Sequence, residues 1–183
     1  MKNVILLAVA ATFALGACDN NKNDAAAPTP QAEKAAGSDT IASGIDANSK
    51  FMAAAKAAGL DATLSGPGPY TVLVPSDAAF DKLPAGALDT LMKPESRADL
   101  TAVLTYHILP GTILAQDISK AIEQGKGSAK LPTMGGGEIT ATKVGDKIVL
   151  ADAAGGKATI AEADVKRSNG VIHHIDGVLM PTR

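Results

Sequence analysis

The spacing of apolar residues changes near the middle of the sequence, and this change limits the folds that the chain can adopt. Residues 49–60 are rich in alanine and place Phe51 and Met52 on one face at helical spacing, and Pro94 fits the first position of a helix that reaches Thr105. Short runs of β-forming residues dominate the second half, at 138–144, 147–150, 157–163 and 170–179. Helices followed by antiparallel strands predict an α+β domain rather than alternating βαβ units.

Residues with special backbone preferences mark the expected ends of these elements. Gly59 is expected to cap the C-terminus of the first helix, and Pro75 to end a strand over 70–74. Ser76 or Asp77 can cap the helix that follows, because a short side chain accepts a hydrogen bond from an N–H of the first turn.

The second half shows similar signals. Asp117 is expected to cap a short helix over 118–124, and Gly145 and Asp146 are of the residue types found in two-residue hairpin turns. The three glycines at 135–137 predict an unusually flexible loop.

The N-terminus has the layout of a secretory signal peptide over residues 1–17. Lys2 supplies the positive charge, residues 4–15 are apolar apart from Thr12, and the small residues Gly16 and Ala17 follow. The apolar stretch is too short to be a stable membrane anchor. We therefore expect the protein to be exported.

Cys18, the only cysteine of the chain, directly follows Leu15-Gly16-Ala17. Leu-Gly-Ala-Cys resembles the bacterial lipobox, in which cleavage precedes the cysteine and its thiol receives diacylglycerol. The alternative is an ordinary signal peptide with an incidental cysteine. We expect a lipoprotein that carries palmitate-type acyl chains and is anchored in the cell envelope. Either membrane, and either a periplasmic or a surface-facing position, stays open.

Residues 19–39 contain no aromatic or branched aliphatic side chain. Such a segment cannot bury enough apolar area to offset the entropy cost of ordering it. We expect residues 18–39 to form a lipidated flexible tether, which Pro28 and Pro30 stiffen locally. The folded domain is then expected over residues 40–183.

Composition argues against several classes of function. The 17 basic and 19 acidic residues do not favour a nucleic-acid partner, which needs a clustered basic face. A single cysteine excludes disulfide frameworks and cysteine-based zinc sites within the chain. The sequence has no Gly-x-Ser-x-Gly elbow, and residues 125–130 lack the Walker spacing. We expect no enzymatic activity and no cofactor.

Histidines are the side chains that most invite a chemical interpretation. His173 and His174 point to opposite faces if they lie on a strand, so they cannot chelate one ion together, and we expect one to be buried and one exposed. Tyr106 and His107 likewise diverge if extended. We expect a core tyrosine and a hydrogen-bonded histidine there. The alternative is that one of them contacts a partner directly.

Three blocks of sequence resemble the fasciclin family. Tyr70-Thr-Val-Leu-Val-Pro-Ser-Asp-Ala-Ala-Phe80 resembles its first signature, and Tyr106-His-Ile-Leu-Pro-Gly111 its central Tyr-His motif. Asn169-Gly-Val-Ile-His-His-Ile-Asp-Gly-Val-Leu-Met-Pro181 resembles its C-terminal block. This resemblance implies a wedge of antiparallel β-sheets with a helical cap. It also implies an extracellular or surface-anchored protein that takes part in adhesion.

Three functions of different classes follow from the resemblance and the composition. The first is a tethered adhesion or interaction module whose protein or matrix partner is unknown. The second is a carrier of an apolar small molecule such as a lipid or a carotenoid. The third is a structural envelope protein without a specific ligand.

Overall fold

The computed structural model describes residues 39–182. The expected signal peptide, Cys18 and most of the expected tether lie outside the described residues. Within residues 39–182, no helix is both long enough and apolar enough to cross a membrane. The first described residue, Asp39, already contacts the domain through an ion pair with Arg167 at 2.9 Å.

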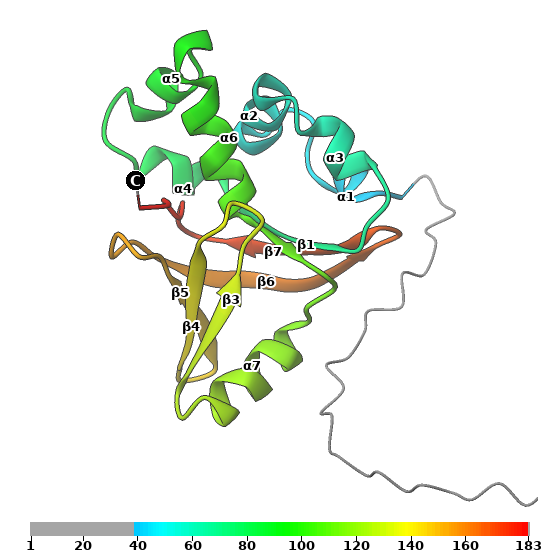
Figure 1. The fold of residues 1–183 in the computed structure, drawn as a ribbon, viewed down its shortest axis with the longest axis vertical. Helices are drawn as coiled ribbons and strands as arrows, with labels where there is room; N and C mark the ends of the chain where they lie inside the picture. The colour runs from blue at the N-terminus through cyan, green and yellow to red at the C-terminus, as the bar shows by residue number, and fades with distance from the viewer. Residues whose placement is uncertain (1–38, 183) are drawn as a thin grey trace, which may run out of the picture.

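Most helices come from the first half of the chain and most strands from the second, in an α+β architecture (Figure 1). The helical elements are α1 (Ile41–Gly44), α2 (Lys50–Ala58), α3 (Asp61–Ser65), α4 (Asp77–Asp81), α5 (Ala87–Leu91), the 3-10 turn η1 (Pro94–Ser96), α6 (Arg97–Tyr106) and α7 (Ala115–Gln124). The strands are β1 (Tyr70–Pro75), β2 (Ile108–Pro110), β3 (Ser128–Pro132), β4 (Glu138–Val144), β5 (Lys147–Ala151), β6 (Lys157–Arg167) and β7 (Gly170–Ile175).

The strands form one sheet in the order β2-β1-β7-β6-β5-β4-β3. All neighbours are antiparallel except β1 and β7, which pair in parallel over six residues, from Tyr70 with Gly170 to Pro75 with Ile175. The expected α+β wedge is confirmed, but the sheet is mixed rather than purely antiparallel. A parallel pair needs a long connection, and here helices α4–α6 and much of the sheet separate its two strands.

Strand β6 joins the two halves of the wedge. Its first residues pair with β5, whereas residues from Ile160 to Arg167 pair with β7. Register shifts interrupt the second pairing between Ile160 and Val165, and such bulges bend and twist a strand. In Figure 1, β1, β7 and β6 cross the molecule below the helices, and β3, β4 and β5 turn away from them.

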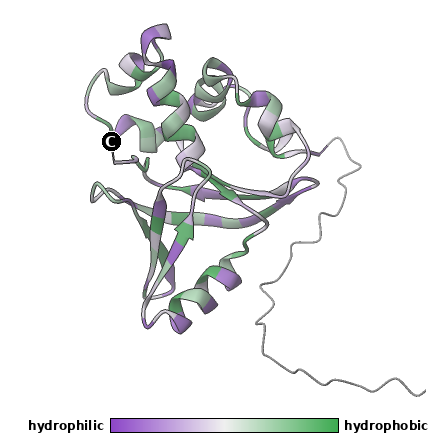
Figure 2. Ribbon diagram, in the orientation of Figure 1, coloured by the Kyte–Doolittle hydropathy of each residue, from purple (hydrophilic) through white to green (hydrophobic). Residues whose placement is uncertain are grey.

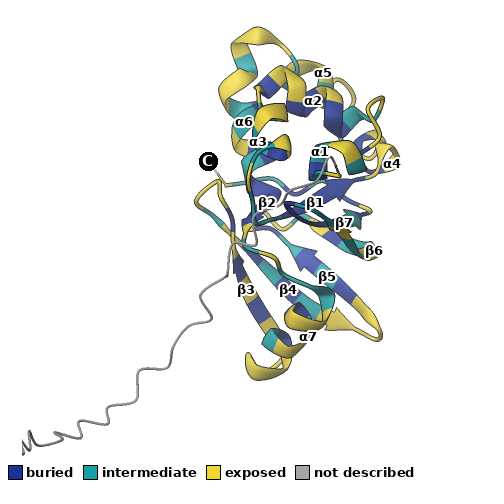
Figure 3. Cartoon of the chain, turned by 90° about the vertical axis from the view of Figure 1, so that its right-hand side faces the viewer, coloured by how far each residue is buried: buried dark blue, intermediate teal, exposed yellow. Residues whose placement is uncertain are grey.

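Two apolar clusters lie on opposite faces of the central strands. Val72 and Val74 of β1 belong to the cluster beneath the helices, whereas Leu73 belongs to the cluster enclosed with α7. Strand β7 divides in the same way, with Ile172 on one side and Ile175 on the other. Figure 3 shows the burial of these strands, and Figure 2 shows apolar residues along them. Strands buried on both faces explain why their sequences are almost continuously apolar.

Local signals in the sequence are confirmed at several element ends. Gly59 ends α2 at φ 78°, as predicted. Ser76, rather than Asp77, caps α4. Val144 pairs with Lys147, so residues 145 and 146 form the predicted two-residue turn.

Several local predictions differ from the structure. The last strand, β7, ends at Ile175 rather than reaching residue 179. The helix expected from Pro94 is divided into the 3-10 turn η1 and the helix α6. Helix α7 begins at Ala115, three residues earlier than predicted, and Asp117 lies inside its first turn. The sequence analysis also missed β3, whose Ser-Ala-Lys-Leu-Pro run is short and weakly apolar but alternates between exposed and buried residues.

Asn169 fastens the helical layer to the sheet. Its Nδ2 donates to Leu64 O at 2.9 Å and to Gly66 O at 2.8 Å, while its Oδ1 accepts from Ile41 N at 2.7 Å. The side chain is almost fully buried in the turn between β6 and β7. One amide thus satisfies backbone groups of α1, α3 and the turn after α3.

We predict that Asn169→Ala lowers the free energy of unfolding by about 3 kcal/mol, because three buried backbone groups lose their partner at about 1 kcal/mol each. Urea melts measure this change. Ser168→Ala is the matched control, since the Ser168 hydroxyl donates to Asp39 O at the surface, and its cost should stay below about 1 kcal/mol. Equal costs for the two variants would contradict the role of Asn169.

Candidate functional site

Tyr106 and His107 lie where α6 ends and the chain enters the sheet. Tyr106 is the last residue of α6, and His107 is its C-cap with helical backbone angles (φ −85°, ψ −2°). The two residues are therefore not extended as the sequence analysis assumed. Because the chain bends here, the Tyr106 and His107 side chains contact different segments of the domain.

The Tyr106 side chain is a core residue that is 1% exposed. Its ring belongs to the apolar cluster beneath α7, and its hydroxyl donates to Glu138 O at 2.7 Å. Burial raises the pKa of this hydroxyl, so the group stays protonated and remains a donor. The ring therefore links the end of α6 to the start of β4.

The glycines at 135–137 form a fitted loop against Tyr106 rather than the flexible loop that the sequence predicted. A Cβ at Gly137 would lie 2.6 Å from Tyr106 Cε2, and one at Gly135 would lie 3.0 Å from the Tyr106 backbone nitrogen. Gly136 has open space around it but adopts φ 85°, which glycine tolerates best. Hydrogen bonds from Gly135 N to Thr105 O and from Thr133 N to Gly137 O hold the loop in place.

Both ring nitrogens of His107 are bonded to backbone groups. Leu179 N donates to Nε2 at 3.1 Å, so Nε2 carries no proton and Nδ1–H donates to Val103 O at 2.8 Å. Burial of the ring lowers its pKa to about 4. The imidazole is therefore neutral near pH 7 and joins α6 to the C-terminal segment.

Asp152 holds the same C-terminal segment from the next residue. Its Oδ2 accepts from Met180 N at 2.7 Å, and its Oδ1 accepts from Gly156 N at 2.7 Å. A Cβ at Gly156 would lie 2.5 Å from the Asp152 carboxylate, so a glycine is required beside it. His107 and Asp152 together fix two consecutive backbone N–H groups after the last strand.

His173 has a similar role at the opposite side of the cluster. Asp164 N donates to its Nδ1 at 3.1 Å, and its Nε2–H donates to Ile113 O at 2.9 Å. Burial lowers the pKa of His173 as well.

The start of α7 is capped from a distant strand. The Asp164 carboxylate accepts from Ala115 N at 2.8 Å, so a residue of β6 caps α7. Asp117, which was expected to cap this helix, instead accepts from Leu114 N at 3.2 Å.

The structure separates the histidines. His173 is fully buried, and His174 is half-buried on the other face of β7, opposite Glu162. No hydrogen bond joins His107 to either of them. Residues 39–182 contain no group of three or more His, Cys, Asp or Glu side chains that could hold a metal ion.

Several residues with a structural role in the domain were not recognised from the sequence. They are Asn169, Asp152, Asp164 and the glycines 135–137. The Asn169-Gly170 dipeptide, which is typical of turns, was an available signal for the first. The other three depend on contacts between distant segments, which leave no local pattern.

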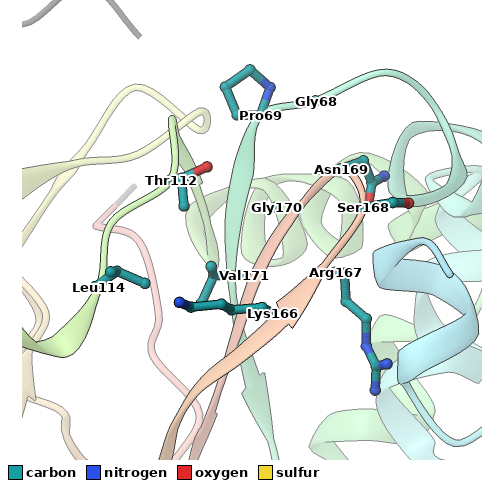
Figure 4. A pocket seen from close by; sticks show the side chains of 10 residues that line it. All are labelled: Gly68, Pro69, Thr112, Leu114, Lys166, Arg167, Ser168, Asn169, Gly170 and Val171. Carbon is teal, nitrogen blue, oxygen red and sulfur yellow. The ribbon is translucent and has the colours of Figure 1, made fainter. Parts of the chain in front are cut away.

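A hollow of about 370 Å³ lies between the β6–β7 turn, the start of β1 and the segment before α7 (Figure 4). Figure 4 shows Lys166 extending toward Leu114, whereas Arg167 points away toward α1. Thr112, Ser168 and Asn169 add polar groups to the lining. None of the residues singled out as chemically interesting in the sequence lies in this hollow.

We predict that the cost of Gly137→Ala depends on the Tyr106 ring. The added methyl group should destabilise the protein by about 1–3 kcal/mol through overpacking, and Tyr106→Ala by about 3–5 kcal/mol through a cavity. The double variant should cost less than the sum of the two in urea melts, because the cavity accommodates the methyl group. Gly136→Ala is the control: its backbone strain should add fully to the cost of Tyr106→Ala. Additive costs for Gly137 would contradict the contact.

We predict that the free energy of unfolding falls as the pH drops from about 6.5 toward 4. The folded-state pKa of His107 is about 4, below the ordinary value of 6.5, so the unfolded chain binds more protons in this window. His107 alone should contribute a loss of about 2 kcal/mol between pH 7 and pH 5, and His173 acts in the same direction.

Urea melts at both pH values measure this loss. His107→Gln should lower stability at pH 7 but flatten the dependence, since the titrating ring is gone. His174→Gln removes a histidine without touching either buried ring, so the fall should persist. Equal slopes for His107→Gln and the unchanged protein would refute the assignment.

Comparisons with known proteins agree with the three sequence blocks. The Fasciclin domain family model matches residues 46–181. Protein sll1483 of Synechocystis is 40% identical over 141 residues, which make up 77% of this chain and 71% of that protein. The transforming growth factor-beta-induced protein ig-h3 of Sus scrofa is 36% identical over 132 residues, which cover 72% of this chain but only 17% of that protein.

A solved structure is similar in fold. A FAS1 domain pair from the insect cell adhesion molecule fasciclin I superposes with a TM-score of 0.66 at 21% identity, covering 76% of this chain and 50% of that one. The architecture, the order of the three blocks and the family match agree with one another. The chain belongs to the fasciclin domain family.

Proposed function

We propose that this protein is an exported adhesion or interaction module without enzymatic activity, held at the bacterial cell envelope by acyl chains on Cys18. Family membership supports the general class, since the matched solved structure comes from a cell adhesion molecule. The lipobox-like Leu15-Gly16-Ala17-Cys18 supports the anchor.

The observation that carries the non-catalytic proposal is the use of the motif side chains inside the domain. Both ring nitrogens of His107 and of His173 are bonded to backbone groups, and the Tyr106 hydroxyl is bonded to Glu138 O. A general base needs a free nitrogen within reach of a substrate, and these nitrogens are occupied and buried. The partner then meets exposed residues of the domain, and the Tyr106-His107 motif acts by maintaining the fold.

The hollow of Figure 4 does not favour the alternative of an apolar-ligand carrier. Lys166, Ser168 and Asn169 are among its lining residues, whereas sites for apolar ligands are lined mainly by hydrophobic and aromatic side chains. A carrier of a polyene would be visibly coloured after purification from its native membrane. A visible absorption band in the purified protein would therefore support the carrier and count against the adhesion module.

We predict that Cys18→Ser abolishes incorporation of radiolabelled palmitate and releases the domain from the membrane fraction. The reason is that the thiol is the acylated atom in the proposed anchor. Both readouts are made on cells that produce the full chain. A variant that remains labelled and membrane-bound would show that the anchor is assigned wrongly.

The interaction itself is tested by crosslinking on intact cells, followed by identification of whatever is attached to the domain. Tyr106→Phe keeps the ring and loses one hydrogen bond, so it should remain folded and keep the crosslinked partner. Loss of the partner in this variant, with an unchanged urea midpoint, would make the motif a contact site. Failure to crosslink any envelope or matrix component would favour a purely structural protein.

A further inference from the structure

One end of the molecule combines three lysines with an exposed valine. Lys143 and Val144 end β4, Lys147 begins β5, and the connection from α7 to β3 carries Lys126. Ser128 pairs with Thr142, so the two turns are neighbours. We call Lys126, Lys143, Val144 and Lys147 the β4–β5 tip. In Figure 1 this tip lies at the end of the molecule farthest from the helices above the sheet.

Val144 is 64% exposed, more than Met134 at 47%, the other large apolar residue exposed in the part of the chain described. All residues from Lys143 to Lys147 are exposed (Figure 3). The cross-strand partner of Val144 is Lys147, which is itself exposed, and Val144 belongs to neither apolar cluster. It adds nothing to the core and is available to an outside surface.

The lysines of the tip take part in none of the ion pairs found among residues 39–182. Asp146 lies in the β4–β5 turn and Glu123 in the last turn of α7, so the three tip lysines retain an excess of one positive charge over these two carboxylates. The helical half of the domain has the opposite balance, with eight acidic and five basic side chains over residues 39–106. An anionic surface would attract the tip and repel the helices.

Lys126 has a backbone conformation that disfavours lysine. Its φ is 57°, in the left-handed region where glycine and asparagine are the usual residues, and it lies between two glycines. The backbone conformation alone therefore does not account for a lysine at this position.

We propose that the β4–β5 tip docks on the surface of an anionic phospholipid bilayer. The lysines complement the phosphate charge, and Val144 gains by entering the boundary between headgroups and acyl chains. A purely acidic polymer would satisfy the lysines but would leave the valine in water. Docking would orient helices α1–α6 away from the membrane, whereas the end of α7 lies beside the tip. This proposal goes beyond the adhesion function and does not depend on acylation of Cys18.

Binding to vesicles tests the proposal. The full chain carries Cys18→Ser in every variant, and its co-sedimentation is compared on vesicles of phosphatidylcholine alone and of phosphatidylcholine with one third phosphatidylglycerol. The N-terminal segment, which carries Lys2, is the same in every variant, so its contribution cancels when variants are compared on the same vesicles. We expect stronger binding to the anionic vesicles, weakened about fivefold for each tip lysine replaced by glutamine.

The matched control replaces Lys56, Lys93 and Lys157, which are exposed elsewhere, by glutamine. It removes the same charge but should leave most of the binding intact. Lys126→Gly should weaken binding while leaving the melting temperature unchanged or raised, because glycine suits φ 57°. The proposal would be overturned if replacing Lys126, Lys143 and Lys147 together by glutamine reduced binding no more than the control triple variant does.

Tryptophan fluorescence reports which end enters the bilayer, since the chain contains no tryptophan. Val144→Trp should show a blue shift and quenching by brominated lipids on anionic vesicles. Met134→Trp, at the opposite end of β3 and β4, should show neither. Equal shifts at both positions would overturn the proposal, as would no shift at residue 144. Retention of the tip on polyglutamate without binding to vesicles would instead indicate an acidic macromolecule.

Discussion

Loops that cross the interior of a protein bring backbone N–H and C=O groups away from water, and each group then needs a partner. In this domain a few polar side chains meet that need. His107 and His173 each bond two backbone groups, and Asn169 bonds three. Because each side chain joins segments that are distant in sequence, the placement of α1, α7 and the C-terminal segment depends on them.

This arrangement separates the roles of the two apolar clusters and of the polar side chains between them. The clusters on the two faces of β1 and β7 supply the apolar burial that drives folding. The polar side chains then determine the conformation of each loop, since another conformation would leave a buried donor or acceptor without a partner. A neutral imidazole suits this work because it offers one donor and one acceptor at fixed positions.

Sequence reasoning predicted the parts of the fold that depend on local chemistry. Gly59, the cap at Ser76 and the turn at residues 145 and 146 follow from preferences of the residues at those positions. It could not predict the partnership of Gly137 with Tyr106, or of Asp164 with the start of α7, because these depend on contacts between distant segments. Strand alternation predicted that one of His173 and His174 would be buried and the other exposed, but not which one; His173 is buried and His174 is half-buried. The partner of β1 could not be predicted, because a parallel neighbour leaves no turn in the sequence.

The parallel pairing of β1 with β7 affects the order in which the sheet can form during synthesis. Tyr70 pairs with Gly170, so β1 leaves the ribosome 100 residues before the strand that covers its inner edge. Until β7 emerges, an almost continuously apolar strand is without its central neighbour, and such edges promote association between chains. The central part of the sheet can therefore close over β1 only after nearly the whole domain has been synthesised.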